Sequence, residues 1–198
     1  MKLVVGLGNP GPKYETTRHN VGFLAIDRLV ERWRATGPVD RNQAEVYQAK
    51  VGSEQVLLIK PMTFMNLSGK SLGPLFTFYK CKPEDVIVIH DELDLLPITL
   101  RLKAGGGSGG HNGLKSIAEH IGTDNIGYYR VRLGVGHPRM FNMRMSPADY
   151  VLGQFTNDEL KRLDPLLDQA AQAIEWVIDG NIRKAMNEFN RAEKPESV

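Results

Sequence analysis

Short apolar runs alternate with segments of helical periodicity along this chain, and this alternation limits the possible folds more than any other feature. Lys2–Gly6 and Val86–His90 have the apolar character of buried strands. Val21–Arg34 repeats apolar residues three and four positions apart, which predicts an amphipathic helix. Because strands that alternate with helices favour a sheet covered on both faces, the sequence predicts a single three-layer α/β domain over residues 1–198, with a twisted mixed sheet flanked by helices.

Turn and capping signals predict the remaining elements. Gly52 and Ser53 separate two strand-like runs, 44–51 and 55–60, and predict a hairpin. Thr156–Glu159 has the capping-box pattern of a helix start, and Gly180-Asn181 predicts the end of that helix. Residues 136–147 hold two prolines and three methionines and predict a mobile loop. The sequence also predicts helices at 67–79, 114–121 and from 182, and strands at 99–103 and 128–135.

Composition limits the compartment and the partners. The chain has one cysteine, Cys81, so it forms no internal disulfide and suits a reducing compartment. It has no signal peptide and no apolar run near 18 residues, so we expect a cytoplasmic protein with no membrane segment. The net charge is only +2, but residues 101–144 carry seven Lys or Arg against Glu119 and Asp124. That local excess indicates a phosphate-bearing partner, although scattered solvated charges explain it equally well.

The loop after the first predicted strand, GLGNPG at residues 6–11, matches the G-x-G-x-x-G pattern of dinucleotide sites. Such a site needs a helix that opens within the glycine turn and faces the pyrophosphate. Here Pro10 and Pro12 interrupt the turn, and helical periodicity begins only near Asn20. The sequence therefore disfavours an NAD site, and no cofactor is expected.

A second glycine-rich loop, AGGGSGGHNG at residues 104–113, contains the G-x-S-x-G pattern of serine hydrolases. That interpretation makes Ser108 the nucleophile and requires an acid and then a histidine further along the chain. No later acidic residue stands out, and His111 is too close to follow one. We favour a flexible loop whose backbone N–H groups approach phosphate or ester oxygens. A serine esterase that uses Ser108 remains the alternative.

Polar side chains follow the predicted strands and the glycine loop: Asn9, Asn66, Asp91 and Asn112. Ligands of open α/β sheets bind beyond the carboxyl ends of the strands, so the first three are expected to converge there. A carboxamide offers both a donor and an acceptor, which suits an amide-like substrate such as a peptide. Each asparagine taken alone is better explained as a turn or cap residue, but three or four of them at strand ends weaken that explanation.

His19 adds a group that can accept a proton near neutral pH, because its ordinary pKa is about 6.5. Asp91 is the natural partner to fix its tautomer and to stabilise the imidazolium. Without a paired serine or cysteine, the expected nucleophile is water, and an ester is within its reach. His19 alone could also be a residue at a helix start. The five histidines show no metal-ligand spacing, so no metal is expected.

Taken together, six stretches of the chain resemble the bacterial peptidyl-tRNA hydrolases in sequence, order and spacing, and they cover essentially its whole length. They are VGLGNPGPKYETTRHNVGF (5–23), KPMTFMNLSGKS (60–71), HDELDL (90–95), GGGSGGHNGLKSI (105–117), YYRVRLGVGHP (128–138) and DYVLGQF (149–155).

The resemblance implies a monomeric, metal-independent α/β hydrolase that cleaves the ester between a peptide and the 3′ end of tRNA. Such an enzyme recycles tRNA from aborted translation. His19 matches the general base, Asp91 the carboxylate that orients it, and Asn9 the residue that tells blocked from free aminoacyl groups. The other matched positions would bind the substrate or the tRNA acceptor end: Tyr14, Phe64, Asn66, Asn112, Arg101, Lys103, Arg130 and Arg132.

Two departures from the commonest pattern of these enzymes stand out. Ser108 occupies a position where many relatives have histidine, and Ile98-Thr99 replaces a frequent Pro-Gly turn. The first would change the mobility of the glycine loop or its contacts with the acceptor end. A non-catalytic RNA-binding module that uses only the basic residues is a further hypothesis, and it predicts tRNA binding without hydrolysis.

Overall fold

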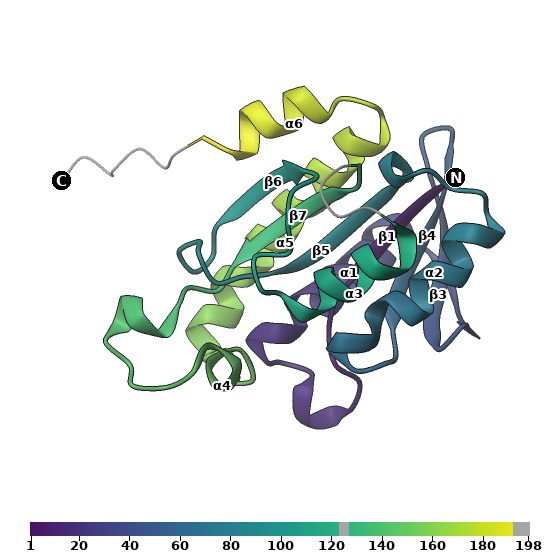
Figure 1. Ribbon diagram of the computed structural model, residues 1–198. Coiled ribbons are helices and arrows are strands. Elements are labelled where there is room, and N and C mark those ends of the chain that lie inside the picture. The colour runs from purple at the N-terminus through teal and green to yellow at the C-terminus, as the bar shows by residue number, and fades with distance from the viewer. Residues whose placement is uncertain (123–126, 192–198) are drawn as a thin grey trace.

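A mixed seven-stranded sheet forms the centre of the computed structural model, which describes residues 1–122 and 127–191 (Figure 1). The strand order is β2-β3-β4-β1-β5-β7-β6. Parallel pairing joins β4, β1, β5 and β7, whereas β2, β3 and β6 are antiparallel to their neighbours. Asp124 of the basic segment lies outside the described residues. The strands are β1 (Lys2–Gly6), β2 (Thr36–Arg41), β3 (Ala44–Val51), β4 (Glu54–Pro61), β5 (Val86–Glu92), β6 (Leu100–Ala104) and β7 (Tyr129–Gly134).

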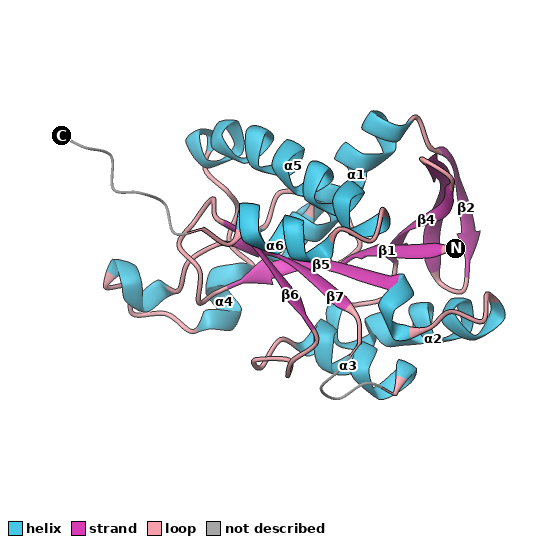
Figure 2. Cartoon of the chain, turned by 90° about the horizontal axis from the view of Figure 1, so that it is seen from above, coloured by secondary structure: helices cyan, strands magenta, loops and turns pink. Residues whose placement is uncertain are grey.

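Helices cover both faces of the sheet, as predicted (Figure 2). On one face lie α1 (Val21–Trp33), α5 (Asn157–Ile178) and α6 (Ile182–Phe189); on the other lie α2 (Ser68–Phe78) and α3 (Asn112–Ile121). The short α4 (Pro147–Val151) follows the loop after β7. Single 3₁₀ turns are η1 (Pro12–Tyr14), η2 (Arg18–Asn20), η3 (Met65–Leu67), η4 (Pro83–Asp85) and η5 (Pro138–Phe141). Within the described part of the chain, no helix is long and apolar enough to cross a membrane.

Alternate side chains of β5 separate the two halves of the core. Ile87 and Ile89 pack with α1 and α5, whereas Val86 and Val88 pack with α2 and α3. The strand continues through His90 and Asp91, which stay buried although both are polar. Buried polar groups need hydrogen-bond partners, so this end of β5 must be held by hydrogen bonds as well as by apolar packing.

Most of the predicted elements are confirmed, with ends shifted by one or two residues. Thr156 caps α5 in a complete capping box with Glu159. The strand β2 was not predicted, and residues 136–147 are not all loop, because η5 lies within them and α4 begins at Pro147. The missed signal for α4 is Ser146, whose hydroxyl accepts the backbone N–H of Asp149 as an N-cap.

The edge strand β6 is covered at its middle by a side chain. The backbone N–H of Leu102 donates to Oδ1 of Asn190 at 2.7 Å, and Nδ2 of Asn190 donates to the carbonyl of Leu102 at 2.9 Å. Asn190 follows α6 directly, and the guanidinium of Arg101 reaches the carbonyl of Phe189 at 3.3 Å. These bonds attach the last helix to the edge of the sheet.

Candidate active site

Two asparagines fix the loop that follows β1. The carboxamide of Asn20 accepts the backbone N–H of Asn9 at 2.8 Å and donates to the carbonyl of Asn9 at 2.9 Å. Oδ1 of Asn9 in turn accepts the backbone N–H of Met65 at 2.8 Å. The loops after the parallel neighbours β1 and β4 are thereby joined. Among the described residues, Nδ2 of Asn9 has no hydrogen bond, so this amide is available to a ligand.

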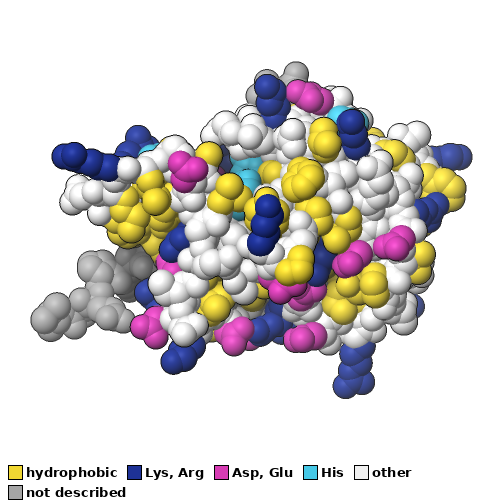
Figure 3. Space-filling view, turned by 90° about the horizontal axis from the view of Figure 1, so that it is seen from below, with side chains coloured by type: hydrophobic (Ala, Val, Ile, Leu, Met, Phe, Trp, Pro, Cys, Tyr) yellow, Lys and Arg dark blue, Asp and Glu magenta, His cyan; other side chains and the backbone are white. Residues whose placement is uncertain are grey.

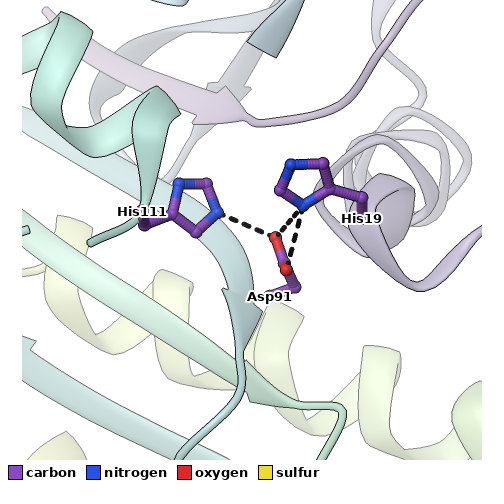
Figure 4. Close-up of side chains that lie close together, drawn as sticks. All are labelled: His19, Asp91 and His111. Atoms are coloured by element: carbon purple, nitrogen blue, oxygen red, sulfur yellow. Dashed lines mark hydrogen bonds and ion pairs between the residues drawn. The ribbon is translucent and has the colours of Figure 1, made fainter. Parts of the chain in front are cut away.

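Asp91 lies between two histidines that come from different parts of the chain (Figure 4). Nδ1 of His19, in η2, is 3.0 Å from each carboxylate oxygen, and Nε2 of His111 is 2.8 Å from Oδ1. Nδ1 of His111 accepts the backbone N–H of Gly113 at 3.2 Å, because His111 caps α3. His111 therefore donates through Nε2, and His19 donates through Nδ1 while its Nε2 points away from the carboxylate.

The pKa values of this group follow from burial and pairing. Burial alone would raise the pKa of Asp91, but the charges and hydrogen bonds of His111 and His19 outweigh it and hold the pKa far below its ordinary range. Burial likewise opposes protonation of His19, yet the carboxylate of Asp91 raises the pKa of His19 above 6.5. An imidazole beside a fixed carboxylate gains basicity, which a general base requires.

His90 is a third histidine in contact with the group, and burial keeps it neutral by lowering its pKa to about 3. Its Nδ1 lies 2.7 Å from the carbonyl of Asp91, and its ring meets that of His111 edge to face, with 5.1 Å between the centroids. Within the described residues, Nε2 of His90 has no hydrogen-bond partner. His90 thus contributes packing and orientation to the site, and no charge.

A cavity of about 660 Å³ lies over these side chains. In Figure 3, histidine side chains are visible in a hollow beside hydrophobic side chains. Four predicted residues line the cavity together: Asn9, His19, Asp91 and Asn112. Its other walls come from the glycine loop, from the residues after Asp91 and from α4 with the segment before it.

Three predicted substrate residues lie outside this lining. Asn66 and Phe64 are exposed, and Phe64 directly precedes η3, in which Asn66 lies. Tyr14 ends η1, where Nζ of Lys13 lies 4.8 Å from the centre of its ring. The loop that carries Asn66 nonetheless packs on the start of α3, since a Cβ at Gly113 would lie 2.7 Å from the sulfur of Met65. Their contacts with substrate stay predictions.

The four predicted basic residues face each other in pairs across β6 and β7, Arg101 opposite Arg132 and Lys103 opposite Arg130. Lys103 is exposed, whereas Arg130 is only 3% exposed and donates to the carbonyl of Gly107 at 2.9 Å. Burial lowers the pKa of Arg130. Arg132 pairs with Glu92 at 3.0 Å. Arg130 therefore holds the glycine loop, and Lys103 is the member of the group most open to a phosphate.

The geometry does not favour either glycine motif as the reactive site. Ser108 lines the cavity, but its hydroxyl forms no hydrogen bond within the described part of the chain, and both nitrogens of His111 have other partners. The turn at Gly6–Gly11 is followed by η1, and α1 begins only at Val21. Residues 1–122 and 127–191 therefore form neither a serine nucleophile with its base nor a helix that faces a pyrophosphate.

His111 is the functional candidate that sequence reasoning missed. The sequence offers it as the histidine of a serine triad with Ser108, a role that its spacing excludes, and as one of five histidines that lack metal-ligand spacing. The available signal was its place directly before a helix, where a side chain caps backbone N–H groups and is held in one orientation. His19, Asp91 and His111 also place one ligand atom each within 4.8 Å of one another, a spacing at which these three described residues could hold a metal ion.

Comparison with known proteins agrees with this architecture. The family model for peptidyl-tRNA hydrolase matches residues 3–197. The chain is 47% identical over 191 residues to the peptidyl-tRNA hydrolase of Anaeromyxobacter dehalogenans, with 96% of this chain and 97% of that protein covered. Identity to the Bordetella avium enzyme is 46% over 193 residues, covering 97% and 92%. The crystal structure of peptidyl-tRNA hydrolase from Acinetobacter baumannii matches with a TM-score of 0.87 at 38% identity, covering 96% and 94%. The chain therefore belongs to the peptidyl-tRNA hydrolase family and is an enzyme that hydrolyses peptidyl-tRNA.

Proposed function

We propose that His19 is the general base of this hydrolase and that water is its nucleophile. The observation that carries the proposal is the orientation of the ring: Asp91 holds Nδ1, whereas Nε2 forms no hydrogen bond with any described residue and lies beside the cavity. Nε2 removes a proton from water as the water oxygen attacks the ester carbon. The resulting imidazolium then donates that proton to the 3′ oxygen of tRNA as the ester bond breaks. The products are free tRNA and a peptide with a free carboxyl group.

Asn9 and Asn112 are proposed to bind the peptide side of the ester. Nδ2 of Asn9 is open to the carbonyl of an N-blocked aminoacyl group, and a free amino group offers no such acceptor. Asn112 lines the same cavity at the first turn of α3, where an anion or a developing oxyanion is also favoured by the helix. Asn66, Tyr14 and Phe64 are proposed to contact substrate that extends beyond the cavity along η1 and η3.

Arg101, Lys103, Arg130 and Arg132 are proposed to hold the acceptor end of tRNA. Their support is the register of β6 and β7, which gathers four cations on two neighbouring strands beside the glycine loop. A Cβ at Gly106 would lie 2.7 Å from Nζ of Lys103 and 2.9 Å from the guanidinium of Arg130. The loop therefore passes close to these cations, and a bound phosphate would contact both the loop and Lys103.

The same proposal extends to the whole chain. We propose that residues 1–198 act as one domain and one monomer, without metal or cofactor, in the cytoplasm where ribosomes make peptidyl-tRNA. In support, the seven strands of the described residues belong to one sheet, and one cavity collects residues from the loop after β1 and from η2, β5, α3 and α4. The hydrogen-bonded set of His19, Asp91 and His111 supplies the proton transfer that water attack needs.

The test is release of the amino acid from N-acetyl-aminoacyl-tRNA, with unblocked aminoacyl-tRNA alongside, by the wild type and by His19→Ala. We expect the wild type to cleave only the blocked substrate. We expect His19→Ala to lose turnover and to keep most of its tRNA affinity. Near-normal turnover by His19→Ala would refute the proposed base, and cleavage that is lost in Ser108→Ala would favour the serine mechanism. Tight tRNA binding by the wild type without cleavage would favour a binding module.

A further inference from the structure

Arg18 directly precedes His19 in η2, and its guanidinium reaches the segment that follows β7 instead of the catalytic group. One of its terminal nitrogens lies 3.3 and 3.2 Å from the two carboxylate oxygens of Glu159, in the first turn of α5. The carbon of the guanidinium lies 4.5 Å from the ring centre of Tyr150, in α4, and 5.8 Å from that of Phe155. The Arg18 side chain is only 13% exposed, so its ion pair and cation–π contacts are partly shielded from water.

Backbone bonds join the same two segments. The N–H of Arg18 donates to the carbonyl of Gly153 at 3.0 Å, and the N–H of Phe155 donates to the carbonyl of Thr16 at 2.9 Å. An isolated bridge pairs Thr17 with Gln154 between them. A Cβ at Gly153 would lie 2.9 Å from Nη1 of Arg18, so the guanidinium packs against this backbone. The turn that carries His19 is therefore fixed to the chain between α4 and α5.

On its other side, the turn that carries His19 is attached to the loop after β1. Asn20, the residue after His19, forms two hydrogen bonds with the backbone of Asn9. His19 thus lies between Arg18, attached to the C-terminal segments, and Asn20, attached to the loop after β1. A single 3₁₀ turn is short and has poorer hydrogen-bond geometry than an α-helix, so it does not orient a side chain by itself.

One atom of Arg18 shows that this arrangement is not optimised for stability alone. Nε of Arg18 is buried and has no hydrogen-bond partner among the described residues. A buried donor without a partner costs free energy of folding, whereas an apolar side chain between the same two rings would not carry that cost. Such local departures from the best packing are concentrated at functional sites.

We propose that Arg18 is a positioning residue for the hydrolysis, because it sets the place of His19 relative to α4 and the cavity. The inference rests on the proposed role of His19 as the base. α4 supplies Pro147, Ala148 and Val151 to the cavity wall, and Tyr150 of the same helix packs on Arg18. One cation therefore fixes the base on one side and the wall around the peptide on the other. A displacement of about 1 Å in such a group can cost about 100-fold in rate.

The test compares Arg18→Met with Arg28→Met in the full-length chain. Met keeps the apolar stem and removes the charge. Arg28 is the matched control, because it also attaches α5 by ion pairs, to Asp164 and Asp168, but from α1 and away from His19. With N-acetyl-aminoacyl-tRNA as substrate, we expect Arg18→Met to lower kcat by roughly 10- to 100-fold, with a smaller change in KM. Arg28→Met is expected to keep kcat within about twofold of the wild type while it lowers the thermal midpoint.

Two milder variants test the same contact in case Arg18→Met does not fold. Glu159→Gln removes the charge that Arg18 pairs with and keeps the capping box of α5, because Gln also serves at that position. We expect it to lower kcat in the same direction as Arg18→Met. Arg18→Lys keeps a positive charge near the rings of Tyr150 and Phe155 but loses the planar guanidinium with its paired donors. We therefore expect its kcat to lie between that of the wild type and that of Arg18→Met.

A measurement without substrate separates positioning from general stability. The ring protons of His19 can be followed by NMR as pH changes, and we expect Arg18→Met to lower the pKa of His19 towards 6.5 as the contact with Asp91 loosens. An unchanged kcat and an unchanged His19 titration would overturn the inference, as would an equal loss of kcat in Arg28→Met. If His19→Ala keeps its turnover, His19 is not the base and the proposed function fails. If His19→Ala loses its turnover but Arg18→Met keeps its kcat, His19 remains the base and only the positioning role of Arg18 fails.

Discussion

His19 Nδ1 lies 3.0 Å from both carboxylate oxygens of Asp91, so one carboxylate fixes the tautomer and the tilt of the ring together. The carboxylate can do this at neutral pH because His111 donates to it from the other side. Without the second donor, a carboxylate that is 2% exposed would carry a larger desolvation cost. The relationship makes the pH dependence of hydrolysis the most direct test of the site.

The pH profile is expected to move when Asp91 loses its charge. His19 must be unprotonated to accept a proton, and Asp91 raises the pKa of His19 above 6.5. The acidic limb of the pH profile, in which kcat/KM of the wild type rises as His19 loses its proton, should therefore lie above pH 6.5. In Asp91→Asn burial acts alone on His19, and the limb should move below pH 6.5. At the pH optimum we expect kcat to fall by about 10²- to 10⁴-fold. Initial rates from pH 5 to 9, corrected for spontaneous ester loss, measure both effects; identical limbs, or a change in KM alone, would argue against the pairing.

Salt dependence reports the proposed tRNA contact of Lys103. We expect Lys103→Ala to weaken tRNA binding and to reduce the slope of log affinity against log salt by about 1, since one phosphate contact is lost. The matched control is Lys161→Ala, which removes the same charge from an exposed position of α5. Titrations at several salt concentrations provide the slopes. If Lys103→Ala slows cleavage of a peptide ester that lacks tRNA to the same extent, its role is not phosphate binding.

Stability towards acid should depend on His90. Its folded pKa is lowered to about 3, so between that value and 6.5 the unfolded chain binds a proton that the folded chain excludes. The free energy of unfolding should therefore decrease as pH falls through this window, by up to about 1.4 kcal/mol per pH unit. The His90→Gln variant should be less stable at pH 7 and lose less on acidification. Urea unfolding between pH 4 and 7, with His120→Gln as the control, tests this; parallel curves for His90→Gln and the wild type would contradict it.

The methionines after β7 are expected to affect the choice of peptide. Met140, Met143 and Met145 are between 41% and 48% exposed, and their neighbours Arg139 and Ser146 line the cavity. Unbranched apolar side chains adapt to partners of varied shape. We expect Met140→Ser with Met143→Ser to raise KM for peptidyl-tRNA with bulky apolar residues next to the ester, and to leave N-acetyl-glycyl-tRNA unaffected. Val39→Ser, an exposed position on the far edge strand β2, is the control; an equal effect on both substrates would exclude peptide contact.

The sequence predicted the elements that are strongly patterned. The apolar runs of β1 and β5, the periodicity of α1 and the capping box at Thr156 each have one local cause, and each prediction is confirmed. β2 could not be predicted in the same way, because five of its six residues are exposed and it is held by pairing with β3. An edge strand without an apolar face leaves no periodicity to detect.

The prediction that residues at strand ends converge holds for Asn9 and Asp91, whereas Asn66, which comes after β4, is exposed and lies outside the cavity lining. Asn9 follows β1, and Asp91 lies near the end of the parallel neighbour β5, so topology places both at one rim. His111 depends instead on how α3 packs over β5, and Arg130 on burial beneath the glycine loop. Both contacts join residues that are about 20 positions apart in the sequence. The chemical type of each residue alone does not predict such contacts.

The pairing of Asn190 with Leu102 also bears on whether another chain can add to the edge of the sheet. An unpaired edge strand is a template onto which another chain can add by backbone pairing. Here the carboxamide of one residue occupies the N–H and the carbonyl at the centre of β6, as a neighbouring strand would. A chain that ends before residue 190 would keep all the strands and cavity-lining residues that the structure describes, and would leave this edge of β6 open to backbone pairing. Asn190, directly after α6, thus covers the part of this edge that another chain could pair with, a role separate from catalysis.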